Sequence, residues 1–149
     1  MTQPTQEQLK ELIELYQSGK LDEAEIEVQK LLKQFPNDLT CLNILGVITD
    51  RKGQTEQAIK IYQKALQINE NSAETHFNIG SILHRLGRSN EARISYEKAI
   101  TIKPDFLNAY FNLGLVYQNL QSYKEAIENY QKAIELKSDF HEAIGAMGT

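Results

Sequence analysis

A period of 34 residues is the feature that most constrains how this chain can fold. Four columns keep one register along it: Ala24, Ala58, Ala92 and Ala126; Lys30, Lys64, Lys98 and Lys132; Gly46, Gly80, Gly114 and Gly148; Tyr62, Tyr96 and Tyr130. Such agreement indicates a stacked structural unit rather than one irregular core. The units are predicted at residues 5–38, 39–72, 73–106 and 107–140, and residues 141–149 begin a fifth unit or form a capping helix.

Each unit is predicted to form two helices, as the fourth unit illustrates. Its first helix is expected over residues 107–120, where apolar residues follow the spacing of one helix face: Tyr110, Leu113, Val116 and Tyr117. Its second helix is expected over residues 123–136, with these residues facing inward: Ala126, Ile127, Tyr130, Ala133 and Ile134. A hairpin of two amphipathic helices therefore repeats along the chain.

Glycine and proline occur at fixed positions of the repeat, where they indicate a close helix contact or a helix end. Gly114 lies inside a predicted helix, where glycine costs about 1 kcal/mol relative to alanine. We therefore expect the second helix to approach closely at this position. A further glycine column ends each first helix, in the place where a left-handed residue is common, and is interrupted in the fourth unit: Gly19, Gly53, Gly87 and then Gln121. Pro36 and Pro104 are expected to stop the second helices of their units.

The spacing of these residues resembles the tetratricopeptide repeat. The motif is clearest in the fourth unit, at Tyr110, Leu113, Gly114, Tyr117, Ala126, Tyr130 and Ala133. The resemblance implies an all-α fold of antiparallel helix pairs that stack into a right-handed superhelix. It also implies a protein-binding scaffold and not an enzyme. The first unit is the poorest match, and its charged first helix predicts a solvated N-terminal cap. A coiled coil is disfavoured because glycine and proline interrupt any heptad.

In a stack of this kind the first helices line a concave face. Positions 2, 5, 6, 9, 12 and 13 of each unit lie opposite the packing side. We predict that a peptide or protein partner contacts these residues: Asn43, Val47, Arg51, Phe77, Asn78, Ser81, His84, Arg85, Asn108, Phe111, Asn112, Leu115, Gln118 and Asn119.

Asn78 and Asn112 share position 6 of their units. An asparagine amide can bond both the N–H and the C=O of an extended peptide. This pair is similar to the asparagine ladder of O-linked N-acetylglucosamine transferases, although both residues could equally be solvated helix-face residues. The carboxylate clamp of chaperone-binding members is not expected, because Asn43, Val47 and Asn108 stand where it needs other side chains.

Other classes of function find little support in the composition. The net charge of −4 argues against nucleic acid, and no apolar run approaches the roughly 20 residues of a membrane span. The three histidines, His76, His84 and His141, lack metal-ligand spacing, and Cys41 is the only cysteine. No phosphate loop or nucleophile motif occurs. We therefore expect a cytoplasmic protein with no catalytic residues, cofactor, metal or membrane.

Two hypotheses of function stay open at this stage. The first is a scaffold that binds a protein or peptide on the concave face. The alternative is the substrate-recruiting region of a larger enzyme, such as a glycosyltransferase or sulfotransferase. The match of residues 141–149 to the start of a fifth unit predicts that the chain is a piece of a longer protein. The exposed apolar end that this leaves also favours self-association.

Overall fold

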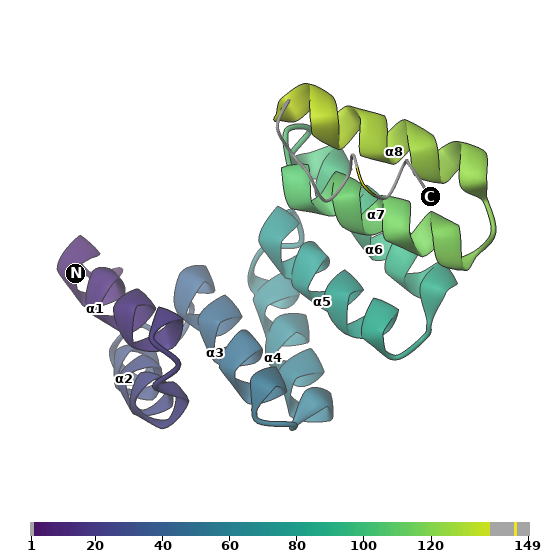
Figure 1. Ribbon diagram of the computed structural model, residues 1–149. Coiled ribbons are helices and arrows are strands. Elements are labelled where there is room, and N and C mark those ends of the chain that lie inside the picture. Colours follow the sequence, from purple (N-terminus) through teal and green to yellow (C-terminus); the bar gives the residue numbers. More distant parts are fainter. Residues whose placement is uncertain (1, 138–144, 146–149) are drawn as a thin grey trace. The chain divides into compact units, whose positions relative to one another are not determined.

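The computed structural model describes residues 2–137 and 145, and in this part of the chain it consists of eight α-helices (Figure 1). Consecutive helices pack as antiparallel pairs, which confirms the predicted all-α class. The helices are α1 Gln6–Gln17, α2 Leu21–Gln34, α3 Leu39–Arg51, α4 Thr55–Ile68, α5 Ala73–Arg85, α6 Ser89–Ile102, α7 Leu107–Asn119 and α8 Tyr123–Leu136. The predicted start of a fifth unit falls outside these described residues, apart from residue 145.

The helices belong to two compact units, which hold two helix pairs each and which we describe separately. From here on, "first unit" and "second unit" refer to these, and the 34-residue period is called the repeat. The first unit reaches to Glu70 and holds α1 to α4; the second begins at Asn71 and holds α5 to α8. In the first unit α2 packs against α1 and α3, and α3 packs against α4. In the second unit α6 packs against α5 and α7, and α7 packs against α8.

Each first helix ends in a residue with left-handed backbone. The φ angles are 76° at Gly19, 84° at Gly53 and 77° at Gly87, and Gln121 takes the same conformation with φ 59°. At the end of α7 the Gln121 N–H donates to the Gln118 carbonyl and the Ser122 N–H to the Tyr117 carbonyl. This pair of bonds is a Schellman motif, which satisfies carbonyls that the helix itself leaves unpaired. The predicted helix end is confirmed at the three glycines, and Gln121 takes the same conformation although the glycine column is interrupted there.

Gln121→Gly is expected to stabilise the second unit by about 0.5–1 kcal/mol. A side chain in the left-handed region costs roughly 1–2 kcal/mol, and the extra backbone entropy of unfolded glycine offsets part of that gain. The reverse change, Gly87→Gln, should cost a similar amount. Urea denaturation followed by circular dichroism measures both changes. A stability loss in Gln121→Gly would mean that the glutamine side chain makes a contact worth more than the strain.

Glycine and tyrosine form the close contact between the helices of a pair. A Cβ atom added at Gly80 would lie 2.9 Å from Tyr96 Cε1, and one added at Gly46 or Gly114 would lie closer still to the tyrosine of its own pair. The three tyrosines of this column are at most 1% exposed. The expected close approach at Gly114 is confirmed, because the ring of Tyr130 occupies the space that a side chain there would fill.

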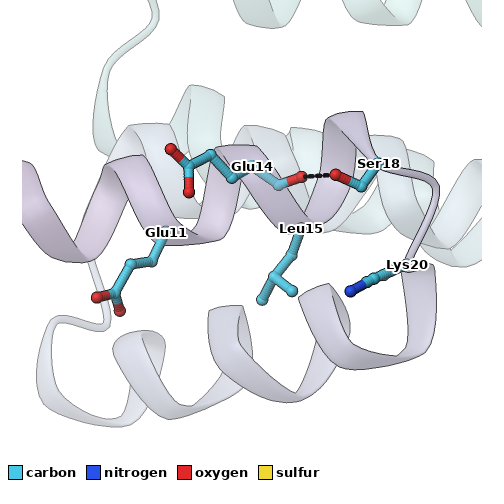
Figure 2. Close-up of a pocket in the computed structure, with 5 residues that line it drawn as sticks. All are labelled: Glu11, Glu14, Leu15, Ser18 and Lys20. Carbon is cyan, nitrogen blue, oxygen red and sulfur yellow. Dashed lines mark hydrogen bonds between the residues drawn. The ribbon is translucent and has the colours of Figure 1, made fainter.

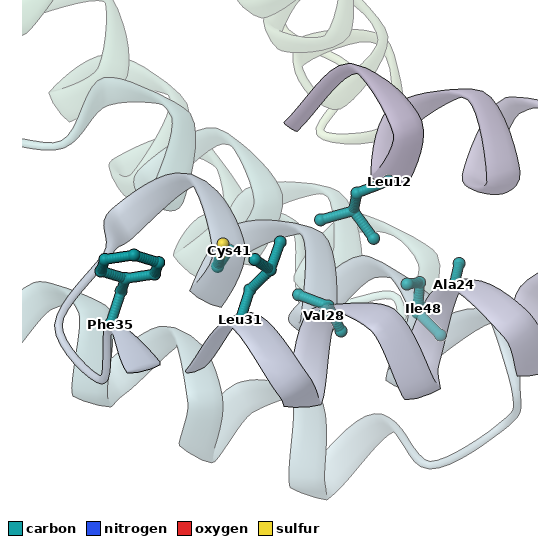
Figure 3. Packing of buried hydrophobic residues seen from close by; sticks show 7 residues of the cluster. All are labelled: Leu12, Ala24, Val28, Leu31, Phe35, Cys41 and Ile48. Carbon is teal, nitrogen blue, oxygen red and sulfur yellow. The ribbon is translucent and has the colours of Figure 1, made fainter. Parts of the chain in front are cut away.

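The first helix pair reverses this contact. Leu12 and Val28 take the positions that glycine and tyrosine hold in the other pairs, and both are fully buried. The larger side chain thus comes from the first helix and the smaller one from the second. Figure 3 shows the cluster that the two residues share with their neighbours Ala24, Leu31, Phe35, Cys41 and Ile48. The pair keeps a filled core with the sizes exchanged between its helices.

The outer face of α1 differs from the equivalent face of α3. Cys41 and Ile48, at positions 3 and 10 of their 34-residue repeat, are fully buried in the cluster with α2. Glu7 and Glu14 hold the same positions in α1 and are exposed. Charged side chains in place of packing residues agree with the solvated N-terminal cap predicted from the sequence.

One prediction about a buried residue of α8 is wrong. Ile127 was expected to face inward on α8, yet it is 42% exposed. It lies one residue beyond Ala126, which is only 2% exposed, and helical geometry turns Ile127 away from α7.

Candidate functional site

In the second unit, the predicted contact surface is built on two phenylalanines at equivalent positions of α5 and α7. Phe77 packs on Tyr96 with ring centroids 5.6 Å apart, and Phe111 packs on Tyr130 at 5.8 Å. Both phenylalanines are half-buried, whereas the tyrosines beneath them are fully buried. The tyrosine that fills each helix pair therefore also supports the aromatic side chain presented above it.

Polar side chains of the predicted surface form hydrogen bonds with the tyrosine hydroxyls. The Tyr96 hydroxyl donates to Ser81 Oγ at 3.2 Å and accepts from Asn112 Nδ2 at 3.4 Å. The Tyr130 hydroxyl donates to Gln118 Oε1. Burial raises the pKa of Tyr96, so its hydroxyl stays protonated and able to donate. The amide of Asn112 thus has a structural contact in addition to any contact with a ligand.

His84 and Asn119 connect α5 to α7 at the far end of these helices. Asn119 Nδ2 lies 3.0 Å from His84 Nε2. Burial lowers the pKa of His84, so its imidazole is neutral at pH 7 and can accept a hydrogen bond from the amide. Arg85, next to His84, is exposed. This end of the surface is therefore polar, in contrast to the aromatic end.

A hollow of about 530 Å³ opens at the N-terminal ends of α5 and α7. It is lined by Ser72, Ala73, Glu74, Phe77, Asn78, Lys103, Phe106 and Asn108. Three of these, Phe77, Asn78 and Asn108, belong to the surface predicted from the sequence. Lys103 and Phe106 were missed because they lie in the turn between α6 and α7, outside any helix periodicity. Only the tertiary packing of α5, α6 and α7 brings the centroid of the Phe106 ring to 4.8 Å from that of the Phe77 ring.

In the first unit, Val47 is half-buried and Arg51 is exposed on α3. The Arg51 guanidinium carbon lies 4.5 Å from the centroid of the Tyr16 ring on α1, a cation–π contact between two first helices. Asn43 differs from the other predicted residues. It is 3% exposed and donates to the Leu39 carbonyl of its own helix at 3.1 Å. Its side chain is not presented to a ligand, so we leave it out of the surface.

A second hollow, of about 390 Å³, lies between α1 and α2 (Figure 2). Glu11 and Glu14 line it on α1, and Leu15 extends toward α2. Ser18 Oγ donates to the Glu14 carbonyl at 2.7 Å, which closes the helix end.

Among the described residues no group of three or more His, Cys, Asp and Glu side chains could hold a metal ion. In residues 2–137, no helix is long and apolar enough to cross a membrane.

Comparison with known proteins agrees with this architecture. A family model described as TPR repeat matches twice, at residues 51–87 and 80–121, and a model described as Tetratricopeptide repeat matches residues 107–140. The crystal structure of MamA is 30% identical over 91% of this chain and 79% of that chain, with a TM-score of 0.77. No curated protein sequence matches the chain. The chain belongs to the tetratricopeptide repeat family.

Two further solved structures share the fold. YrrB, described as a TPR protein with an unusual peptide-binding site, is 24% identical over 91% of this chain and 70% of that chain, with a TM-score of 0.75. PilF of Pseudomonas aeruginosa is 23% identical over 94% of this chain and 64% of that chain, with a TM-score of 0.87. At these identities the likeness concerns the fold, and the predicted arrangement of antiparallel pairs as a TPR solenoid is confirmed.

Proposed function

We propose that this chain is a protein-interaction module that binds an extended segment of a partner along its first helices. We call the contact residues of α5 and α7 the first-helix surface: Phe77, Asn78, Ser81, His84, Arg85, Asn108, Phe111, Asn112, Leu115, Gln118 and Asn119. Val47 and Arg51 are the candidates in the first unit. The observation that carries the proposal is the pair Phe77 and Phe111, each held half-buried on a buried tyrosine.

Such a surface suits an extended peptide for two physical reasons. Aromatic side chains that are already packed lose little conformational freedom on binding, so more of the contact energy becomes affinity. Polar side chains of the same surface, among them Asn108 at the aromatic end and Asn119 at the far end of α7, can bond the backbone of a bound segment. The peptide-binding site named in the description of YrrB supports a peptide as the class of ligand. The choice of contact residues rests on the structure of this chain alone.

An alternative is that the same surface recruits the substrate of a catalytic domain on a longer chain. Asn78 and Asn112 at equivalent positions of α5 and α7 favour it, because amides in a row can follow a peptide backbone whatever the downstream chemistry. The reading frame around this chain distinguishes the alternatives. The binding contacts are the same in both.

Selection from a random library of displayed twelve-residue peptides tests the proposal. Peptides recovered on the chain should bind it in calorimetry, and Phe111→Ala should weaken them at least about tenfold, as at a central aromatic contact. Ile94→Ala is the matched control, because Ile94 is a 45% exposed apolar residue on α6, outside this surface. Circular dichroism verifies that both variants fold. Recovery of no binding peptide, or equal losses in the two variants, would count against the proposal.

A further inference from the structure

We propose that the hollow between the N-terminal ends of α5 and α7 is the anchor pocket of the first-helix surface. It takes one large apolar side chain of the partner, flanked by a basic residue on one side and an acidic residue on the other. This inference rests on the proposed function and deepens it, because it states which partner sequence the surface selects.

The floor of the pocket consists of stacked aromatic rings. Phe106 and Phe77 have centroids 4.8 Å apart with planes tilted by 30°, and Phe77 packs in turn on Tyr96, whose side chain is fully buried. Phe77 and Phe106 are half-buried, so each ring keeps surface that a guest can cover. A floor of this kind favours an aromatic or branched apolar side chain, which stacks on the rings and leaves no polar group unpaired.

The size of the pocket agrees with such a guest. Its volume of about 530 Å³ lies within the range of roughly 300–1,000 Å³ typical of sites for small ligands. It is lined by residues of α5, of α7 and of the turn before α7, all within one compact unit. One large side chain with its flanking backbone is therefore a suitable occupant.

Two opposite charges line the hollow, and they come from different elements. Glu74 lies on α5, and Lys103 lies in the turn between α6 and α7. Among the described residues, neither side chain forms an ion pair or a hydrogen bond, although Lys103 Nζ lies 5.0 Å from the Phe106 ring centroid. The complementary ligand presents a cation toward α5 and an anion toward the turn. Exposed charges of this kind contribute orientation and selectivity more than affinity.

Asn108 completes the rim on α7. It is exposed, and its side chain forms no hydrogen bond with the described part of the chain. Its amide can donate to a carbonyl and accept from an N–H of an extended backbone next to the anchor. The pocket thus offers an aromatic floor for one side chain, two charges that set the direction of the segment and an amide for its backbone.

An array of synthetic nine-residue peptides tests the inference. The central residue is Phe, Leu or Ala, and lysine and glutamate flank it in both orders. Wild-type protein should bind the central Phe and Leu peptides at least about tenfold more tightly than the Ala peptides, and should prefer one charge order by about threefold or more. The double variant Glu74→Lys/Lys103→Glu should prefer the opposite order, a reversal that general destabilisation cannot produce.

Phe77→Ala and Phe111→Ala separate this inference from the proposed function. If the pocket is the anchor, Phe77→Ala abolishes the preference for a central apolar residue while Phe111→Ala keeps it. If peptides bind but Phe77→Ala leaves that preference intact, or the double variant keeps the wild-type charge order, the anchor pocket is wrong and the proposed function survives. If no peptide of the array binds while library peptides do, the anchor pocket is again wrong. Absence of binding in both experiments overturns both proposals.

Discussion

Gly114→Leu is expected to destabilise the second unit by about 3 kcal/mol. The ring of Tyr130 already occupies the space next to the Gly114 Cα, so the added side chain forces α7 and α8 apart. Overpacking a filled core typically costs about 1–3 kcal/mol, and a leucine placed directly against a buried ring belongs at the upper end. The better helix propensity of leucine returns only about 1 kcal/mol. Chemical denaturation measures the loss.

The double variant Gly114→Leu/Tyr130→Val should recover part of that loss. Tyr130→Val alone leaves a cavity and removes the hydroxyl that donates to Gln118, at a cost of about 3 kcal/mol. Combined, the two changes recreate the arrangement of the first helix pair, where Leu12 and Val28 are both fully buried. We expect the double variant to be more stable than the sum of the single changes predicts by at least about 1 kcal/mol.

The first unit supplies the reciprocal control. Leu12→Gly/Val28→Tyr places the glycine and tyrosine of the later pairs into α1 and α2, and it should likewise cost less than its two single changes together. Strictly additive free energies in both cycles would mean that the two positions do not share one packing volume. In that case the common glycine–tyrosine column would need another explanation.

Cys41 is expected to resist thiol reagents in the folded protein by a factor on the order of 10³ relative to an exposed cysteine. The residue is fully buried, and burial together with the neighbouring Asp38 carboxylate raises the pKa of its thiol to about 12. At pH 8 the reactive thiolate is therefore almost absent. The rate of reaction with a chromogenic disulfide should rise sharply across the urea transition, because unfolding exposes the thiol and restores its ordinary pKa.

A cysteine moved by one residue is the control for this experiment. Thr40 is exposed, so Cys41→Ala/Thr40→Cys should react quickly in the folded state at the same pH. Rapid modification of native Cys41 would contradict the packing of α1, α2 and α3 around it. Because the cluster with α2 holds the thiol, the slow rate also reports on local opening of the first unit.

The number, limits and pairing of the helices could be predicted from the 34-residue repeat in the sequence. The predicted second helix at residues 123–136 coincides with α8, and the left-handed helix ends fall where glycines or Gln121 stand. Helix limits depend on local backbone preferences. Glycine, proline and capping side chains set these preferences, so the limits can be predicted from the sequence. The contact between glycine and tyrosine was also predictable, because a glycine inside a helix needs a packing reason.

The candidate site was predictable only in part. Helical periodicity placed Phe77, Asn78 and Phe111 on one face, and the structure places them on α5 and α7 as expected. Periodicity could not tell that the Asn43 side chain is buried, because its exposure depends on the helices that pack around α3. It also could not tell that the Asn112 amide reaches a tyrosine hydroxyl of the preceding pair.

The first-helix faces and their aromatic positions thus follow from the sequence by itself, since helix period and glycine spacing are properties of neighbouring residues. The anchor pocket was decided by the tertiary structure alone. Lys103 and Phe106 come from a turn, and they meet Phe77 and Glu74 only because α6 packs against both α5 and α7. Contacts between residues about 30 positions apart depend on how helices pack, and no local pattern encodes which side chains a turn places against the next helix.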